Sequence, residues 1–144
     1  MVIDIKKLLK DYQSYESKTV IISGWVRNNR AQKEFGFIDL NDGTTFESVQ
    51  VVYEEKSLNQ FKEVSKMNVG SAITVVGNLV LTPTMKQPFE IIAKNIVLEG
   101  SSQEDYPIQP KRHSREFLRE NAHFRPRTNL FNAVFRVRSV VSFA

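Results

Sequence analysis

The amino-acid sequence predicts a mainly β protein whose first 99 residues form a small five-stranded Greek-key barrel. Three observations support this fold: β-branched residues recur in five short stretches, turn signals separate the stretches, and an amphipathic helical stretch follows the third. Three strands, a helix and two strands within about 80 residues is the element order of the OB-fold. A helix before the barrel and a helical extension after it complete the prediction.

The N-terminal segment favours a helix followed by a strand. Asp4 is the expected N-cap, because its short side chain can accept hydrogen bonds from free N–H groups of the first turn. The apolar positions of this helix follow at helical spacing: Ile5, Leu8, Leu9 and Tyr12. The period then changes over residues 19–27, which read TVIISGWVR and suit a first strand.

A hairpin is expected next. Residues 35–40 read FGFIDL and residues 46–53 read FESVQVVY, so both suit strands. Between them, Asn41, Asp42 and Gly43 form a tight turn signal. The second and third strands should therefore lie side by side.

The helix and the last two strands follow. Ser57 is the expected N-cap of a helix that ends at the Asn-Val-Gly of residues 68–70. Its apolar face comprises Leu58, Phe61 and Val64. A fourth strand is expected over residues 71–81, a loop with two prolines over 82–88, and a fifth strand over 89–98.

The C-terminal part predicts a linker and two helices. Residues 100–110 are polar and contain proline, Ser114 suits the N-cap of a short helix, and Thr128 or Asn129 suits the start of another. The last helix carries an apolar stripe: Leu130, Val134, Val137 and Val141. No stop signal follows, so we expect a piece of a longer protein with a barrel domain over 1–99, a hinge over 100–118 and the start of a second domain over 119–144.

Composition excludes several classes of site. The 144 residues contain no cysteine, which rules out disulfides and thiolate metal sites. The two histidines, His113 and His123, have no acidic cluster nearby in the sequence, and the six glycines form no phosphate-binding loop. No apolar run approaches the roughly 20 residues of a membrane span, and the N-terminus does not read as a secretory signal. We expect a cytoplasmic protein with no membrane, metal or catalytic residues in this chain.

Charge divides the chain. Residues up to Pro110 carry 12 Lys/Arg and 14 Asp/Glu, whereas the rest carries 8 Lys/Arg and 2 Asp/Glu. A basic block of this kind suits a polyanionic partner, although a solvated helix surface explains it equally well. Binding to nucleic acid by the first part would have to depend on more than charge.

The second strand carries the most informative pattern. Side chains alternate along a strand, so Ile38 and Leu40 share one face, and Phe35, Phe37 and Asp39 share the other. The aliphatic face suits the barrel interior. Exposed aromatics on the other face are how such barrels stack bases, but the rings could also pack under the N-terminal helix.

Three further residues are candidate contacts to nucleic acid. Gln50 carries both a donor and an acceptor and could read a base edge, although a solvent-facing amide is the simpler interpretation. Arg27 and Arg30, at the end of the first strand and in the following loop, could hold phosphates or stack on bases.

The motifs in order resemble one known family. The run GWVR at residues 24–27, FIDL at 37–40 and VQVV at 49–52 is similar to the anticodon-binding domain of asparaginyl-, aspartyl- and lysyl-tRNA synthetases. The segments EFLRE at 116–120 and HFRPRT at 123–128 resemble the asparaginyl family most closely. The aspartyl and lysyl families more typically carry Arg-Tyr-Leu-Asp after the corresponding Leu-Arg.

The resemblance implies roles for residues of this chain. Phe37 would stack on the central uridine of the anticodon, Gln50 would read that base, and Glu90 would contact an anticodon base. Arg27 and Arg30 would lie near the anticodon loop. With a tRNA as the partner, the basic block that begins at Lys111 and Arg112 could touch the tRNA backbone near the hinge. The last helix would lie at the interface of a homodimer.

For the parent enzyme, the resemblance implies a class II ligase that joins asparagine to tRNA(Asn) with ATP and Mg²⁺. No cofactor is expected in this chain, whose catalytic core would be missing. Two alternatives remain at this point: a stand-alone OB-fold module that binds single strands generally, and the same part of an aspartyl-tRNA synthetase with relaxed specificity.

Overall fold

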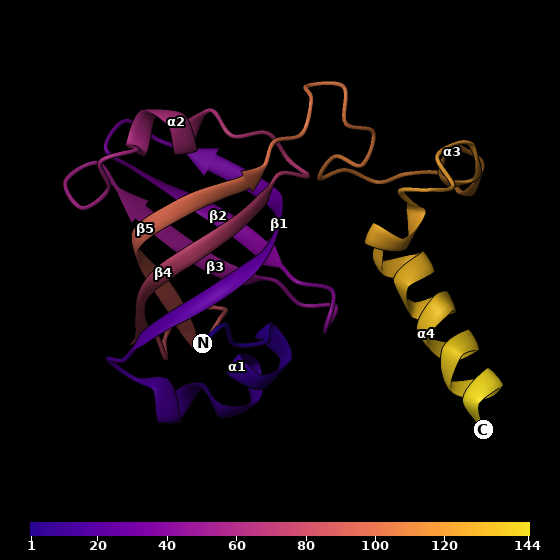
Figure 1. The fold of residues 1–144 in the computed structure, drawn as a ribbon, viewed down its shortest axis with the longest axis horizontal. Coiled ribbons are helices and arrows are strands. Elements are labelled where there is room, and N and C mark those ends of the chain that lie inside the picture. The colour runs from indigo at the N-terminus through magenta and orange to yellow at the C-terminus, as the bar shows by residue number, and fades with distance from the viewer. The chain divides into compact units, whose positions relative to one another are not determined.

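The computed structural model describes residues 1–144 and confirms the closed five-stranded barrel (Figure 1). The strands are β1 (Thr19–Ala31), β2 (Phe35–Asn41), β3 (Val49–Glu54), β4 (Ala72–Leu81) and β5 (Phe89–Gly100). They pair in the order β1-β2-β3-β5-β4, and β1 pairs with β4 to close the barrel. Only β3 and β5 run parallel.

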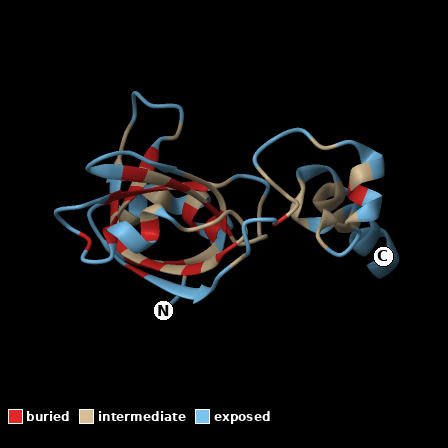
Figure 2. Ribbon diagram, turned by 90° about the horizontal axis from the view of Figure 1, so that it is seen from above, coloured by how far each residue is buried: buried red, intermediate tan, exposed pale blue.

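Alternate residues of the strands fill the barrel. Ile38 and Leu40 of β2 are fully buried, as their spacing predicts, and the buried residues lie along the inside of the barrel in Figure 2. Helix α1 (Ile5–Asp11) and helix α2 (Phe61–Ser65) lie at opposite ends of the barrel (Figure 1), and each contributes apolar side chains to the core. A short 3-10 helix, η1 (Tyr12–Tyr15), connects α1 to β1.

The cap of α1 differs from the sequence prediction. Asp4 occupies the N-cap position, but its side chain makes no capping hydrogen bond. The backbone N–H of Ile5 instead donates to Asp42 Oδ2 at 2.8 Å, and that of Lys6 donates to Thr44 Oγ1 at 3.1 Å. The loop after β2 therefore caps α1 and ties it to the barrel.

The end of β1 and the start of β3 differ from the sequence prediction. Strand β1 continues to Ala31, so Arg30 lies in the strand and not in a loop, because β2 offers pairing partners up to Gly36. Strand β3 begins at Val49 and not at residue 46, because the loop after β2 folds back on itself: the buried Asn41 amide donates to the carbonyls of Thr45 and Glu47.

Ser57 is not the N-cap of α2. The N–H groups of Ser57 and Leu58 donate to the Glu54 carbonyl, which makes a turn directly after β3. Helix α2 starts only at Phe61, and Gln60 occupies its N-cap position without a side-chain hydrogen bond. Leu58 is buried but lies before the helix.

Tyr53 links β2, β1 and α2 inside the barrel. Its hydroxyl donates to Asn29 Oδ1 at 2.8 Å, and Asn29 Nδ2 donates to the carbonyl of Val64 at 2.8 Å. Gly36 pairs with Tyr53 across the strands, and a Cβ on Gly36 would lie 2.3 Å from the tyrosine ring. The ring therefore fills the space that glycine leaves.

We expect this tyrosine to make the fold sensitive to alkali. Burial raises the pKa of the Tyr53 phenol above its ordinary value of 10.0, so the folded state holds the proton more tightly than the unfolded state. The contribution of the buried phenol to the free energy of unfolding is complete below its ordinary pKa and is lost as pH rises through the pKa of the folded state. The unfolding free energy, measured by urea unfolding, should therefore fall more steeply between about pH 8 and about pH 11 in the wild type than in Tyr53→Phe.

The same variant has a second expected effect near neutral pH. There Tyr53→Phe should lower the free energy of unfolding by about 1 kcal/mol, because one hydrogen bond is lost. Equal slopes of unfolding free energy against pH in both proteins would contradict the assignment of this loss to Tyr53, because the other tyrosines and the lysines are common to both.

The C-terminal residues form a second compact unit, from Asp105 to Ala144, after a first unit from Met1 to Glu104. It contains α3 (Arg115–Glu120), the 3-10 helix η2 (Arg125–Arg127) and α4 (Asn129–Phe143). Two predicted caps are confirmed: Ser114 Oγ accepts from Phe117 N at 3.1 Å, and Thr128 Oγ1 accepts from Phe131 N at 3.4 Å.

Helix α4 has no buried residue. The predicted apolar stripe is exposed, with fractions of 45% for Leu130, 47% for Val134, 64% for Val137 and 69% for Val141. No helix of the structure has the length and apolar character that a membrane span requires.

Candidate nucleic-acid interface

The outer face of β1, β2 and β3 brings the candidate residues together. In the strand register, Arg30 lies opposite Phe37, and Asp39 lies opposite Gln50. Directly opposed residues of paired strands point to the same side of the sheet. Arg30, Phe37, Asp39 and Gln50 therefore share the outer face, as the alternation in the second strand predicts.

Phe37 presents its ring on this face. It contacts Phe35 edge to face, with 5.5 Å between the ring centroids, and the Arg30 guanidinium carbon lies 5.5 Å from the Phe37 centroid. Neither ring belongs to the hydrophobic core or packs against it. The structure thus does not support the alternative in which these aromatics pack under the N-terminal helix, and it leaves a supported ring available for stacking.

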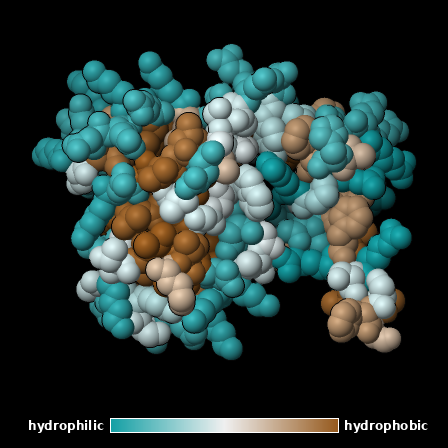
Figure 3. All heavy atoms as spheres, viewed as in Figure 1, coloured by the Kyte–Doolittle hydropathy of each residue, from teal (hydrophilic) through white to brown (hydrophobic).

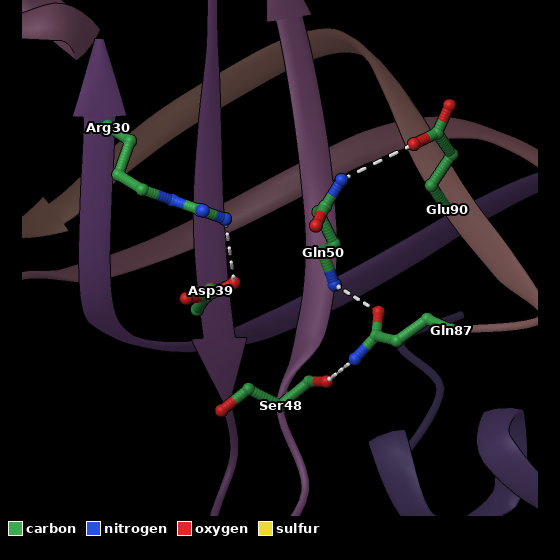
Figure 4. A network of polar contacts seen from close by, with 6 residues as sticks. All are labelled: Arg30, Asp39, Ser48, Gln50, Gln87 and Glu90. Atoms are coloured by element: carbon green, nitrogen blue, oxygen red, sulfur yellow. Dashed lines mark hydrogen bonds and ion pairs between the residues drawn. The ribbon is translucent and has the colours of Figure 1, made fainter. Parts of the chain in front are cut away.

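An open groove of about 610 Å³ is lined in part by Arg30, whose guanidinium lies over this ring. Six of its polar residues come from four strands, from the loop between β2 and β3 and from the loop between β4 and β5: Arg30, Asp39, Ser48, Gln50, Gln87 and Glu90. Figure 4 shows how these residues lie. The groove collects three of the five residues proposed from the sequence for the anticodon, namely Arg30, Gln50 and Glu90.

Hydrogen bonds and charges order the groove. Gln50 Nε2 donates to Glu90 Oε2 at 3.4 Å, and an Arg30 guanidinium nitrogen lies 4.0 Å from Asp39 Oδ1 (Figure 4). These four side chains offer an amide, two carboxylates and a guanidinium, and the guanidinium lies over the Phe37 ring. This set can stack a base and make hydrogen bonds to its edges.

Arg27 takes a different place. It lies at a β-bulge in β1, between Val26 and Asn28, and it does not line the groove. A bulge redirects the side chain that it carries, which the alternation of residues in a sequence does not reveal. Arg27 is nevertheless engaged within the molecule.

Asp39 and Gln87 are two of the groove residues that were not proposed from the sequence. Asp39 stands on the correct face in the alternation pattern, so the signal was present but no role was assigned to it. Gln87 lies in the loop with two prolines, where no periodicity indicates the direction of a side chain. Its place in the groove depends on contacts with β3.

The other side of the barrel has a different character. Figure 3 shows apolar side chains gathered over the strands that face the viewer, among them β4 and β5. These strands carry exposed valines, Val80 at 43% and Val97 at 44%.

A family model described as an OB-fold nucleic acid binding domain matches residues 20–99. The chain belongs to this family. The matched residues contain all five strands except the first residue of β1 and the last residue of β5, together with α2. The family therefore accounts for the barrel and for the face that carries the groove.

Over its full length the chain is similar to known synthetases. It is 58% identical over 144 residues to an asparagine–tRNA ligase of Acholeplasma laidlawii. The match covers 100% of this chain and 31% of the relative. The chain spans about 30% of the length of the curated relatives that it matches.

Solved structures agree with this fold. The asparaginyl-tRNA synthetase of Pyrococcus horikoshii, complexed with asparaginyl-adenylate, superposes with a TM-score of 0.83 at 20% identity, covering 99% of this chain and 32% of that one. A putative aspartyl-tRNA synthetase of Leishmania major Friedlin superposes with a TM-score of 0.79 at 20% identity. The match covers 96% of this chain and 30% of that one. At such identities the likeness shows the fold alone.

Proposed function

We propose that this chain recognises the anticodon of tRNA(Asn) as the anticodon-binding part of an asparagine–tRNA ligase. One arrangement carries the proposal: the Gln50 amide and the Glu90 carboxylate are hydrogen-bonded in one groove of an OB domain, and the Arg30 guanidinium that also lines this groove lies 5.5 Å from the Phe37 ring. The similarity of the full chain to asparagine–tRNA ligases supports this choice of tRNA over a general single-stranded ligand.

Each residue at the groove has a proposed task. Phe37 stacks on the central uridine of the anticodon, and Gln50 reads the edge of that base. Glu90 contacts an anticodon base and holds the Gln50 amide through their hydrogen bond. Arg30 supports the Phe37 ring and, with Arg27, lies near the anticodon loop.

The basic C-terminal unit has a separate proposed task. Lys111 and Arg112 are exposed, and we assign them contacts to the tRNA backbone from a hinge over residues 100–118. Such contacts release counterions, so their contribution falls as salt is added. Residues 119–144 would begin the class II catalytic domain.

The exposed stripe of α4 fits a subunit interface. Leu130, Val134, Val137 and Val141 form an apolar strip that no part of the second unit covers. We propose that this strip pairs in the homodimer of the parent enzyme. That enzyme would use ATP and Mg²⁺ to join asparagine to tRNA(Asn) in the cytoplasm, with catalysis performed outside these 144 residues.

The test is binding to an anticodon stem-loop. We expect this chain to bind a loop with the asparagine anticodon at least about tenfold more tightly than the same loop with its central uridine changed to cytidine, as one to two lost base-edge hydrogen bonds would give. Fluorescence anisotropy at fixed salt measures both affinities. Equal affinity for the two loops and for an unrelated oligonucleotide would favour a general single-strand module and reject anticodon reading.

A further inference from the structure

The edge of β3 lacks a strand partner where it carries the proposed reading residue. On the β5 side, β3 pairs only through Val51 and Val52, opposite Ile91 and Ile92. The backbone at Ser48 and Gln50 therefore lies beyond that short ladder. Unpaired backbone groups on a partly buried edge need another partner.

The Gln87 side chain supplies that partner (Figure 4). Its Oε1 accepts from the Gln50 backbone N–H at 3.1 Å, and its Nε2 donates to the Ser48 carbonyl at 2.5 Å. An amide side chain thus makes the pair of hydrogen bonds that a neighbouring strand would make. It extends the pairing of β3 beyond the last residues that pair with β5.

Gln87 is itself held in place by its loop. Its carbonyl accepts from Thr82 Oγ1 at 2.9 Å, and the Thr82 N–H donates to the Pro88 carbonyl at 2.8 Å. The residue before a proline is restricted to extended backbone, so Pro88 also limits Gln87. The amide of Gln87 is therefore presented to β3 by a loop that is closed at its base.

Two groups fix Gln50 from different directions. Gln87 fixes its backbone, and Glu90 accepts from its side-chain Nε2. The bond to Glu90 leaves the Gln50 Oε1 free to accept from a ligand. Uracil has a donor at N3–H, whereas cytosine has a lone pair at N3, so a fixed acceptor favours uridine over cytidine.

We propose that Gln87 is a positioning residue that holds Gln50 for base reading, and that its loss weakens binding of a uridine loop more than binding of a cytidine loop. This inference rests on the proposed function. Because Gln87 acts on the Gln50 backbone and not on the Phe37 ring, the stacking contribution should survive its removal.

The first measurement needs no RNA. In Gln87→Met, which preserves side-chain length but removes both hydrogen bonds, we expect hydrogen exchange of the Gln50 backbone amide to accelerate by about fivefold or more. Amides in the middle of β4 should be unchanged. An unchanged rate at Gln50 would overturn the inference, because the contact would then contribute nothing.

The second measurement is selectivity, taken as the ratio of affinities for stem-loops with uridine or cytidine at the centre of the anticodon. We expect Gln87→Met to lower this ratio about fivefold while affinity for the cytidine loop changes less than about twofold. Thr84→Ala, at an exposed residue of the same loop that does not line the groove, is the control and should keep the wild-type ratio. Equal weakening of both loops would indicate a merely structural role and overturn the inference.

A second variant protects the test from misfolding. Gln87→Glu keeps the acceptor for the Gln50 N–H but sets a carboxylate against the Ser48 carbonyl, so selectivity should fall here too. A wild-type chain with no uridine preference would overturn the proposed function and the selectivity claim together. A wild-type preference that both variants retain would overturn the role of Gln87 alone.

Discussion

Phe37→Ala should weaken binding to the asparagine anticodon stem-loop by about 1–3 kcal/mol, or roughly 5- to 150-fold, which is the range for one base stacked on an aromatic ring. The Phe37 ring is outside the core, so its truncation removes a ligand contact without opening a cavity. Arg30 and Phe35 hold the ring from two sides, which lowers the entropy lost when a base stacks.

Two matched variants separate stacking from general disturbance of the surface. Phe37→Tyr keeps an aromatic face and should bind within about threefold of the wild type. Phe35→Ala removes the neighbouring ring and should have a smaller effect than Phe37→Ala, because it only loosens the support. Affinities from titration at one salt concentration decide the point, and a Phe37→Ala chain with wild-type affinity would reject the stacking role.

Gly77→Ala should cost about 3 kcal/mol of unfolding free energy, at the upper end of the range for overpacking. Gly77 lies where β4 and β5 shift register, and a Cβ there would lie 2.4 Å from the Ile92 carbonyl oxygen and 2.9 Å from Ile91 Cγ2. The nearest atom is backbone, which cannot rotate away, so the two strands must separate.

Gly100→Ala is the matched control for this loss. Gly100 ends β5, and no heavy atom lies within 4 Å of the position that its Cβ would occupy. We expect its unfolding free energy to stay within about 0.5 kcal/mol of the wild type, as for other surface changes. Urea unfolding of the three proteins measures the difference. Similar midpoints for Gly77→Ala and the wild type would show that the barrel relaxes there at little cost.

Local patterns account for most of the fold. Alternation of β-branched residues identifies all five strands, and the hydroxyls of Ser114 and Thr128 cap their helices because each partner lies three residues away. The cap of α1 could not be predicted because its partners are distant in the sequence. The side chains that cap α1 belong to Asp42 and Thr44. They accept hydrogen bonds from the N–H groups of residues that lie 37 and 38 positions earlier in the chain.

The sequence by itself determined the barrel, its inward aliphatic face and the outward Phe37, because a strand has a period of two wherever it lies in the chain. It also determined Gln50 and Glu90 as candidates, through a family resemblance. Only the tertiary structure decided that these two side chains are bonded, that Arg30 lies over Phe37, and that Arg27 sits at a bulge. These facts depend on strand register and closure of the barrel, which join residues too far apart for any local pattern to relate them.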